Sequence, residues 1–350
     1  MNLNKIAIVQ TNLNIGGIEK SLINFLNNID YRKNEVDLYL FNKGELFSEL
    51  PKKVNVILLD CPNKKKILLG FKINKMLYKP NITKEYDVAI DFNGYDLYTA
   101  ICCLNIQAKK HIIWVHNDYL LKYKHEYKFK VLYQINKNKY HLFDEIVCVS
   151  NKVKQSFIKM TNVISKYRVI PNYINTKNIV KMSKQKNDLK VDNKKVNFVC
   201  LGRLVYQKGY DDLLIKYKEV VKRRKDTHLY FIGDGILKEK LLSLVETLEL
   251  KEYVTFLGSK DNPYTYLKEM DTLVFNSRYE GQGMVVLEAL TLGLNIILKK
   301  ELEQYLDNIK GTNDIVSAMI NEQKHDKKID MLEDYNNRIK KSIEDMIGEK

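Results

Sequence analysis

Short apolar runs alternate with amphipathic stretches along the whole chain. In the first half the runs lie at residues 6–10, 36–41, 54–59, 87–92, 111–116, 145–150 and 168–172. In the second half they lie at residues 196–201, 229–232, 254–257, 273–276 and 295–298. Helical periodicity separates them, most clearly at 18–27, 236–250 and 284–292. Buried strands that alternate with helices indicate parallel sheets covered on both faces. The pattern therefore predicts two α/β units, each a doubly wound, Rossmann-like sheet.

The polar, lysine-rich stretch 176–195 separates the two series and predicts a linker. We expect an N-terminal domain over 1–175 and a C-terminal domain over 196–325, sizes typical of single domains. The charged tail, 326–350, predicts one helix. One arrangement left open by the sequence is that this helix packs back onto the N-terminal domain. Two such domains predict a cleft between them, and ligands bind beyond the carboxyl ends of the strands.

The positive charge of the chain is unevenly placed. Lys and Arg total 58 against 43 Asp and Glu, and residues 1–190 hold 32 of the former but only 16 of the latter. A basic half indicates an anionic partner, which can be nucleic acid, a membrane surface or a phosphorylated substrate. A lysine-rich coding bias, with the charges merely solvated, is the alternative.

Two segments, 63–79 and 119–140, mix lysines with bulky apolar residues. Basic amphipathic segments of this kind can lie on an anionic membrane, although a solvated helix with one face in the core has the same composition. Nucleic acid is less favoured because no recognised binding motif accompanies the lysines. An anionic membrane surface is therefore the macromolecular partner that we expect.

Features of the chain predict a cytoplasmic protein. No apolar run approaches the roughly 20 residues that span a bilayer. The first ten residues are typical of a strand rather than of a signal peptide. The cysteines show no metal-ligand spacing, so we expect reduced, structural thiols at Cys61, Cys102, Cys103, Cys148 and Cys200.

The most informative motif runs from Ser277 to Leu290, with the sequence Ser-Arg-Tyr-Glu-Gly-Gln-Gly-Met-Val-Val-Leu-Glu-Ala-Leu. A strand that passes through glycines into a helix offers free backbone N–H groups and the positive end of a helix dipole to a phosphate. Glu280 and Glu288 bracket this position. Because carboxylates repel phosphate, we expect them to hold hydroxyl groups on either side of it. Hydroxyls that flank phosphates describe a nucleotide sugar.

A second set of candidates follows the strand at 196–201. Arg203 offers a planar fork for phosphate oxygens and Lys208 offers a point charge, although two surface cations would look the same. Gly16-Gly17 opens the first helix, either as an ordinary turn or as a close approach to phosphate or sugar. Neither this pair nor Gly233-Asp-Gly235 completes Gly-x-Gly-x-x-Gly, which disfavours a dinucleotide dehydrogenase.

Polar residues also end strands in the first half. His116 ends the run at 111–116 and is followed by Asn117, a position that favours function over a purely structural histidine. Asn93 and Tyr95 follow the run at 87–92, either in a simple turn or facing the cleft. The chain has no Asp-x-Asp pair, so a divalent metal would lack its commonest ligands.

Together these residues resemble a glycosyltransferase of the GT-B fold, in the large group called family 4. The resemblance covers nearly the whole chain. It rests on Gly16-Gly17, Val115-His116-Asn117, Val169-Ile-Pro-Asn172, Gly202-Arg203-Leu with Lys208-Gly209, Gly233-Asp-Gly235, Val254 to Gly258, and Glu280-Gly with Glu288-Ala. The two glutamates alone are moderately specific, and the glycine-arginine motif at the right distance makes the match strong.

The resemblance implies a role for each matched position. Arg203 and Lys208 would hold the donor diphosphate, Glu288 the ribose hydroxyls, and Glu280 the transferred sugar. His116 would lie near the reacting sugar, as a catalytic residue with Glu280. The other donor contacts would come from Gly17, Gly258, Gly283, Met284 and Val285. The family transfers sugars with retention of configuration and usually without metal, so we expect no cofactor beyond the nucleotide-sugar substrate.

The donor base is expected to be uridine, and the acceptor a glycan or lipid-linked molecule bound by the N-terminal half. Asn93, Tyr95 and Asn117 are the candidates on the acceptor side. The Lys/Asn/Ile-rich composition is typical of an A·T-rich bacterial genome, in which such enzymes build surface polysaccharides. One departure stands out: after residue 298 the family has a small polar turn and a glycine-rich loop, whereas this chain has a helix-like run, 299–305. A non-catalytic subunit that lost donor chemistry, and more remotely a nucleotide-sugar epimerase, are the alternatives.

Overall fold

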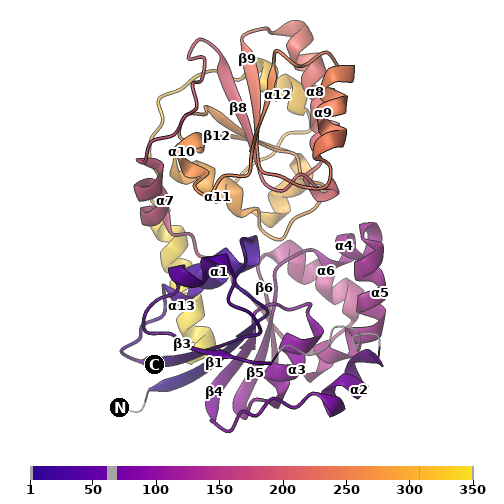
Figure 1. Ribbon diagram of the computed structural model, residues 1–350, viewed down its shortest axis with the longest axis vertical. Coiled ribbons are helices and arrows are strands. Elements are labelled where there is room, and N and C mark those ends of the chain that lie inside the picture. The colour runs from indigo at the N-terminus through magenta and orange to yellow at the C-terminus, as the bar shows by residue number, and fades with distance from the viewer. Residues whose placement is uncertain (1–2, 61–68, 307, 349–350) are drawn as a thin grey trace. The chain divides into compact units, whose positions relative to one another are not determined.

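The computed structural model describes residues 3–60, 69–306 and 308–348 (Figure 1). The chain divides into two compact units, one formed by residues 1–173 with 334–350 and the other by residues 174–333. Each unit is an α/β domain with one parallel sheet, which confirms the predicted fold class. Cys61 and the start of the predicted basic segment 63–79 lie outside the described residues.

Unit 1 contains a seven-stranded sheet in the order β3-β2-β1-β4-β5-β6-β7. The strands are β1 (Asn4–Gln10), β2 (Asn34–Leu40), β3 (Asn55–Leu58), β4 (Tyr86–Asp91), β5 (Ala108–Val115), β6 (Glu145–Cys148) and β7 (Lys166–Val169). Every pairing is parallel, in the register Ile6↔Val88 between β1 and β4. The central strands are buried on both faces over their carboxyl-terminal parts, which explains the apolar sequence there.

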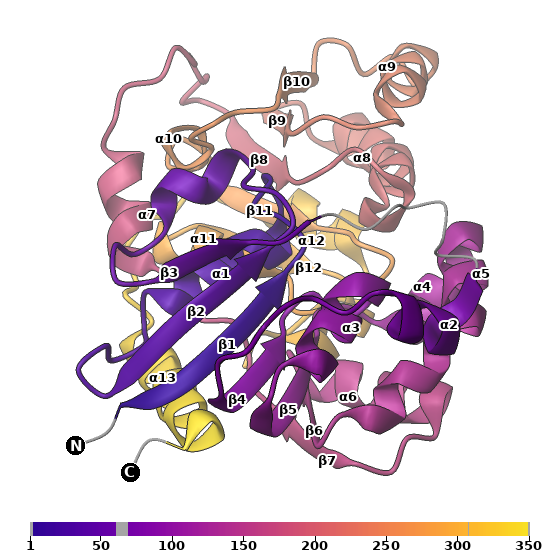
Figure 2. The ribbon, with the colours of Figure 1, turned by 60° about the horizontal axis from the view of Figure 1, so that its bottom comes forward.

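Helices cover both faces of this sheet. They are α1 (Gly17–Leu26), α2 (Gly70–Leu77), α3 (Leu97–Asn105), α4 (Tyr119–His125), α5 (Tyr127–Asn136), α6 (Asn151–Thr161) and α13 (Glu333–Ile347), with the 3₁₀ turns η1 (Glu45–Glu49) and η3 (Lys137–Leu142). α3 packs across β1, β4 and β5, with α2 and α5 beside it (Figure 2). Helix starts follow the sequence: Asp96, Asp118 and Ser150 cap α3, α4 and α6 through side-chain acceptors.

Unit 2 contains a five-stranded sheet in the order β10-β9-β8-β11-β12. The strands are β8 (Val196–Leu201), β9 (Thr227–Ile232), β10 (Val254–Gly258), β11 (Thr272–Phe275) and β12 (Asn295–Leu298). Its helices are α7 (Thr176–Ser183), α8 (Tyr210–Arg223), α9 (Lys238–Thr247), α10 (Tyr264–Leu267), α11 (Met284–Thr291) and α12 (Ile315–Asn321), with the 3₁₀ turns η4 (Tyr206–Lys208) and η5 (Lys300–Tyr305). α8, α9 and α12 share one apolar core with β8 and β9.

Two predicted boundaries differ from the structure. The stretch 176–195, predicted as a linker, begins with helix α7, whose N-terminus is capped by Asn175. This helix packs on α10 and α11 and buries Ile179. The tail 326–350, predicted as one helix, is helical only from Glu333. The preceding residues stay extended along unit 2, where Lys327 Nζ donates to the carbonyl of Lys268 at 2.6 Å.

The start of helix α13 coincides with the boundary between the units. From Asp334 the tail belongs to unit 1, where Asn4 Nδ2 donates to the carbonyl of Ile347 at 2.9 Å. Four of the cysteines are buried free thiols: Cys102, Cys103, Cys148 and Cys200. Over the ranges that the structure describes, no helix combines the length and apolar composition that crossing a bilayer requires.

Candidate active site

The candidate donor residues lie at the point where the strand order of unit 2 reverses. From β8 the chain builds outward through β9 and β10, and then returns to add β11 and β12 on the other side. β8 and β11 are therefore adjacent strands on the two sides of the reversal, and in sheets of this kind ligands bind beyond the carboxyl ends of such strands. Arg203 and Lys208 follow β8, and Glu280 follows β11.

An ion pair joins these two loops. Lys208 Nζ lies 2.7 Å from Glu280 Oε1, and only 17% and 9% of the two side chains are exposed. Ser277 Oγ donates to the same carboxylate oxygen at 2.6 Å. The ammonium also lies 5.6 Å from the centroid of the Phe275 ring, a favourable cation–π distance. The predicted diphosphate ligand and the predicted sugar ligand are thus direct neighbours.

Arg278 clamps the loop after β8 to the loop after β11. Its guanidinium donates to the carbonyl of Tyr206 at 2.6 Å and to Asp211 Oδ2 at 2.9 Å, and it lies 4.1 Å from the centroid of the Tyr206 ring. The backbone N–H of Arg278 donates to the carbonyl of Gln207 at 2.7 Å. Gln207 Nε2 returns a bond to the carbonyl of Tyr279 at 3.0 Å. The backbone on both sides of the ion pair is therefore fixed.

Two glycines permit the close approach of these loops. At Gly209, where φ is +64°, a Cβ would lie 2.5 Å from the carbonyl oxygen of Asn276. At Gly283, the N-cap of α11, φ is +72° and a Cβ would lie 2.8 Å from the Phe275 ring. Side chains are strained in this left-handed region, so glycine is required at both turns. The first backbone N–H groups of α11, at Met284 and Val285, follow directly and can donate hydrogen bonds to an anion.

The remaining donor candidates of unit 2 lie on the loop after β8, on α11 and at the end of β10. Arg203 is exposed, and no described residue forms a hydrogen bond or ion pair with its guanidinium. Glu288, on α11, accepts a hydrogen bond from Tyr264 Oη at 3.0 Å through Oε1. Gly258 is the last residue of β10 and has a φ of +73°. Arg203 is thus available to a ligand, while Glu288 is oriented by a partner.

Unit 1 has its own strand-order reversal, between β1 and β4. Asn93 follows β4 and donates through Nδ2 to Thr11 Oγ1, just after β1, at 3.0 Å. Gly17 is the first residue of α1, and a Cβ there would meet open space. Tyr95 is 44% exposed, with Lys122 Nζ 5.1 Å from its ring centroid. Asn117 instead turns its Oδ1 to the backbone N–H of Asp118, at 2.8 Å.

His116 is a neutral histidine in this environment. Burial lowers its pKa to about 3, and its Nε2 lies 2.8 Å from the carbonyl oxygen of Phe92. Because a carbonyl only accepts, Nε2 carries the proton and Nδ1 is left as an acceptor, enclosed and without a partner among the described residues. The imidazole packs against the rings of Phe92 and Trp114 at 4.6 Å and 5.9 Å. His116 is therefore neutral and holds no proton to give at Nδ1.

The carboxyl group of Asp91, the last residue of β4, also has a shifted pKa. Burial raises its pKa to about 6, while Lys139 and the backbone N–H of Gly94 oppose the rise. Its Oδ1 accepts from the backbone N–H groups of Asn93 and Gly94, each at 3.2 Å. Oδ2 has no partner among the described residues. Lys139 itself is fully buried, which lowers its pKa to about 8.

The structure therefore brings Lys208 and Glu280 into contact, and it places the unit 1 candidates at the ends of β4 and β5. Sequence reasoning missed the residues that hold the donor candidates in place: Ser277, Arg278, Gln207 and Tyr264. Ser277 and Arg278 lie inside the most informative motif, and their contacts are readable only from the folded loops. Tyr264 lies 24 residues from Glu288, and no spacing rule connects them. Within the described ranges, no group of three His, Cys, Asp or Glu residues is arranged to hold a metal ion.

Comparison with known proteins identifies both halves of the chain. Residues 15–178 match the family described as glycosyltransferase family 4, and residues 181–342 match the family described as glycosyl transferases group 1. An uncharacterized glycosyltransferase of Methanocaldococcus jannaschii is 30% identical over 271 residues, which is 73% of this chain and 65% of that relative. The match therefore spans slightly less than two thirds of that protein.

Two further comparisons are informative. An N-acetylgalactosamine-N,N'-diacetylbacillosaminyl-diphospho-undecaprenol 4-alpha-N-acetylgalactosaminyltransferase of Campylobacter jejuni is 30% identical over 132 residues, 38% of this chain and 34% of that relative. Other relatives are named for lipopolysaccharide core, O-antigen and capsular polysaccharide biosynthesis. The crystal structure of HepE from Anabaena in complex with UDP and glucose superposes with a TM-score of 0.66 at 16% identity, over 99% of this chain and 95% of that one.

The paired doubly wound domains define a protein of the GT-B fold. The chain belongs to the glycosyltransferases of the family 4 type.

Proposed function

We propose that this glycosyltransferase transfers a sugar, with retention of anomeric configuration, from a UDP-sugar to a glycan or lipid-linked acceptor in bacterial surface polysaccharide synthesis. The contact between Lys208 and Glu280 carries the proposal, because it places a cation for phosphate next to a carboxylate for sugar hydroxyls. Arg203 and the start of α11 add positive charge at the carboxyl ends of the same strands. The HepE complex supports UDP, and the name of the Campylobacter relative supports a lipid-linked acceptor.

In the proposed reaction the protein must stabilise the nucleoside diphosphate that leaves. The bond from the anomeric carbon to the β-phosphate oxygen breaks, and the negative charge that develops there is met by Arg203, Lys208 and the N–H groups of Met284 and Val285. The acceptor hydroxyl forms the new bond on the same face, and its proton passes to the departing phosphate oxygen. Neutral His116 and Glu280 orient the sugar rather than remove that proton. The proposal includes no metal ion and no cofactor besides the substrate.

We propose a cytoplasmic, peripheral location at the inner face of the cell membrane. A lipid-linked acceptor presents its sugar at that surface, and residues 1–190 carry twice as many basic as acidic residues. Positive charge on this scale favours approach to anionic lipid.

Nucleotide binding and turnover test the proposal together. We expect UDP to raise the melting temperature, and Arg203→Ala to lower kcat/KM for a UDP-sugar by about 100-fold or more. Arg223→Ala is the matched control, because Arg223 is also exposed but lies in the last turn of α8. An Arg203→Ala variant with unchanged kcat/KM would remove the proposed role.

One observation favours a second candidate, a binding subunit without donor chemistry. After β12 the chain forms η5, and Lys299 pairs with Asp212 at 3.1 Å, where the family has a glycine-rich loop. If no nucleoside diphosphate among UDP, GDP and ADP raises the melting temperature, this candidate replaces the first.

A further inference from the structure

Helices α2 and α5 and the turn η3 form one side of unit 1, which we call the α2–α5 face. α2 contacts both α3 and α5, and α5 continues directly into η3. In Figure 2 the labels of α2 and α5 lie side by side at the edge of unit 1, away from β1 and β2. This face is separate from the carboxyl ends of β1 and β4, where the acceptor candidates lie.

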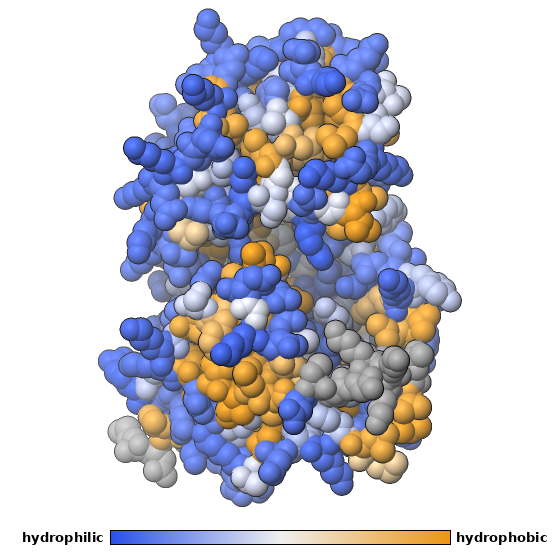
Figure 3. Space-filling model, viewed as in Figure 1, coloured by the Kyte–Doolittle hydropathy of each residue, from blue (hydrophilic) through white to orange (hydrophobic). Residues whose placement is uncertain are grey.

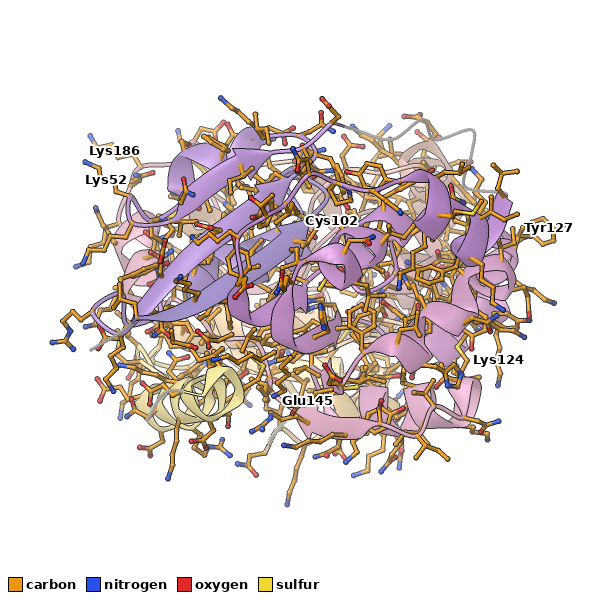
Figure 4. The ribbon with its side chains drawn as sticks, turned by 90° about the horizontal axis from the view of Figure 1, so that it is seen from below. Lys52, Cys102, Lys124, Tyr127, Glu145 and Lys186 are labelled. Atoms are coloured by element: carbon orange, nitrogen blue, oxygen red, sulfur yellow. The ribbon has the colours of Figure 1, made fainter. Side chains whose placement is uncertain are left out.

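The α2–α5 face exposes apolar side chains that a water-facing helix normally avoids. Met76 is 67% exposed, Leu77 54%, Tyr127 79% and Leu142 47%. Ile73, Val131 and Leu132 add smaller exposed areas. Figure 3 shows hydrophobic surface as orange atoms over α2 and α5. In Figure 4 Tyr127 points away from the body of the protein. Contiguous exposed apolar surface of this kind indicates a contact with something other than water.

The charge of the same face is entirely positive. Residues 69–84 contain four lysines and no carboxylate, and residues 127–142 contain the same. Among these lysines, Lys139 is buried and donates to the carbonyl of Asp96 at 2.6 Å, and Lys84 forms ion pairs within unit 1, with Glu35 at 2.7 Å and Asp37 at 2.6 Å. Lys72, Lys75 and Lys79 form no ion pair with any residue of the described ranges. Their charges are therefore available to an outside anion.

A recess of about 410 Å³ lies at the centre of this face. Its described walls combine two lysines of α2 and one that follows this helix with two amides and three apolar side chains: Lys72, Lys75, Lys79, Asn105, Asn138, Phe71, Met76 and Leu142. None of these described lining residues is a carboxylate. The volume falls in the range of small-molecule sites, and the lining suits a group with an anionic head and an apolar body.

We propose that the α2–α5 face docks on a membrane rich in anionic phospholipid, with a lipid phosphate among the lysines of the recess. The glycerol and the first acyl carbons then lie against Phe71, Met76 and Leu142, while Tyr127 enters the headgroup layer. Charge complementarity selects this occupant, because the ammonium groups bind anionic headgroups. The apolar side chains among the lysines are stabilised only if they leave water for an apolar phase, which the acyl chains below the headgroups provide. The inference gives the proposed peripheral location a surface and a lipid class, and vesicle binding requires no donor chemistry.

Co-sedimentation of the full chain with vesicles tests the docking. The probes are vesicles of equimolar phosphatidylglycerol and phosphatidylcholine, and vesicles of phosphatidylcholine alone. We expect binding to the first at low ionic strength, weaker binding in high salt, and little binding to the second. Each lysine near an anionic surface changes partitioning about fivefold, so Lys72→Gln/Lys75→Gln/Lys79→Gln weakens binding by more than tenfold. Met76→Ser/Tyr127→Ser weakens it as well, without any change of charge.

The matched control is Lys52→Gln/Lys53→Gln/Lys159→Gln, which removes the same charge from exposed sites elsewhere in unit 1. Figure 4 labels Lys52 and Tyr127 at opposite edges. The control should bind vesicles nearly as the unaltered protein does. Equal losses in both triple variants, equal binding to the two vesicle types, or retention on a polyanion such as heparin without vesicle binding would each overturn the proposal. A protein that binds vesicles but no UDP would leave the docking intact and remove the proposed donor chemistry.

Discussion

Lys208 Nζ and Glu280 Oε1 form an ion pair at 2.7 Å that joins the loop after β8 to the loop after β11. The two residues lie 72 positions apart and meet where the strand order reverses. In this pair the carboxylate holds the ammonium in place before any phosphate arrives. In the proposed function the two side chains serve different parts of the donor, so their substitutions should be separable.

Lys208→Met should mainly weaken the binding of UDP, by about tenfold or more, because it removes a charge-assisted contact to phosphate. Glu280→Gln should leave UDP affinity within a few-fold and lower kcat instead, because the proposed role of Glu280 is to contact the transferred sugar. Calorimetry with UDP and steady-state kinetics with a UDP-sugar measure the two effects. Equal losses of UDP affinity in both variants would contradict the separation.

Arg278 should control donor affinity without touching the donor. Arg278→Gln removes the bonds to Tyr206 and Asp211, each a bond to or from a charged group, and should lower the free energy of unfolding by about 2 kcal/mol. The loosened loop should raise the Kd for UDP several-fold. Arg278→Lys should not restore affinity, because an ammonium cannot reproduce the planar fork or stack on Tyr206.

The control for this prediction is Asp211→Asn, which removes one ion pair and leaves the stacking and the carbonyl bond. It should have a smaller effect on both quantities. If Arg278→Gln loses stability while its Kd for UDP is unchanged, the clamp supports only the fold.

Tyr264 should contribute to recognition of the ribose through Glu288. Tyr264→Phe removes the hydroxyl that donates to Glu288 Oε1 at 3.0 Å, so the carboxylate loses its orientation. We expect a five- to tenfold loss of UDP affinity, by analogy with the roughly 1 kcal/mol of a typical hydrogen bond. The loss should be much smaller for 2′,3′-dideoxy-UDP, which has no hydroxyl for Glu288 to hold.

Tyr266→Phe is the matched control, because the Tyr266 hydroxyl donates to Asp188 at 2.8 Å, away from Glu288. This variant should bind both nucleotides as the unaltered protein does. Equal losses for UDP and its dideoxy analogue in Tyr264→Phe would show that the tyrosine acts on the fold alone.

Asp91 should make the stability of the protein depend on pH. Burial raises its pKa from 3.8 to about 6, so the folded protein holds the proton more tightly than the unfolded chain does. The resulting stability is present below pH 4 and is lost as the pH rises to about 6. The free energy of unfolding of Asp91→Asn, relative to that of the unaltered protein, should therefore rise across this window, by roughly 1–3 kcal/mol above pH 6.

Urea unfolding of both proteins between pH 4 and pH 8 measures this difference. The amide can still accept the backbone bonds of Asn93 and Gly94, so the loop should survive the substitution. A difference in unfolding free energy that does not vary with pH would contradict the assignment.

Much of this architecture was readable in the sequence. Apolar runs predicted the strands, because a strand buried on both faces cannot alternate with polar residues. The motifs also contained Gly209 and Gly283, where the structure turns sharply and only glycine adopts the backbone angles without strain. The motif residues could be assigned to strand ends, because motif and strand are neighbours along the chain.

Local patterns did not determine which residues meet. The stretch 176–195 has a polar composition typical of a linker, yet α7 forms there because α10 and α11 cover its apolar side. The residues before Glu333 have helical composition, yet contacts with unit 2 such as the bond from Lys327 to Lys268 hold them extended. In both places tertiary packing outweighs intrinsic helix propensity. The free-energy difference that propensity contributes is smaller than that of a few buried contacts.

By itself the sequence determined the class of fold, the order of its elements and the loops that carry the candidate chemistry. The tertiary structure alone decided the pairings: Lys208 with Glu280, Tyr264 with Glu288, and Arg278 with the loop after β8. The reason is physical. Periodicity and turn chemistry act over a few residues, whereas a contact between distant side chains exists only after the strands have assembled and brought their carboxyl ends together.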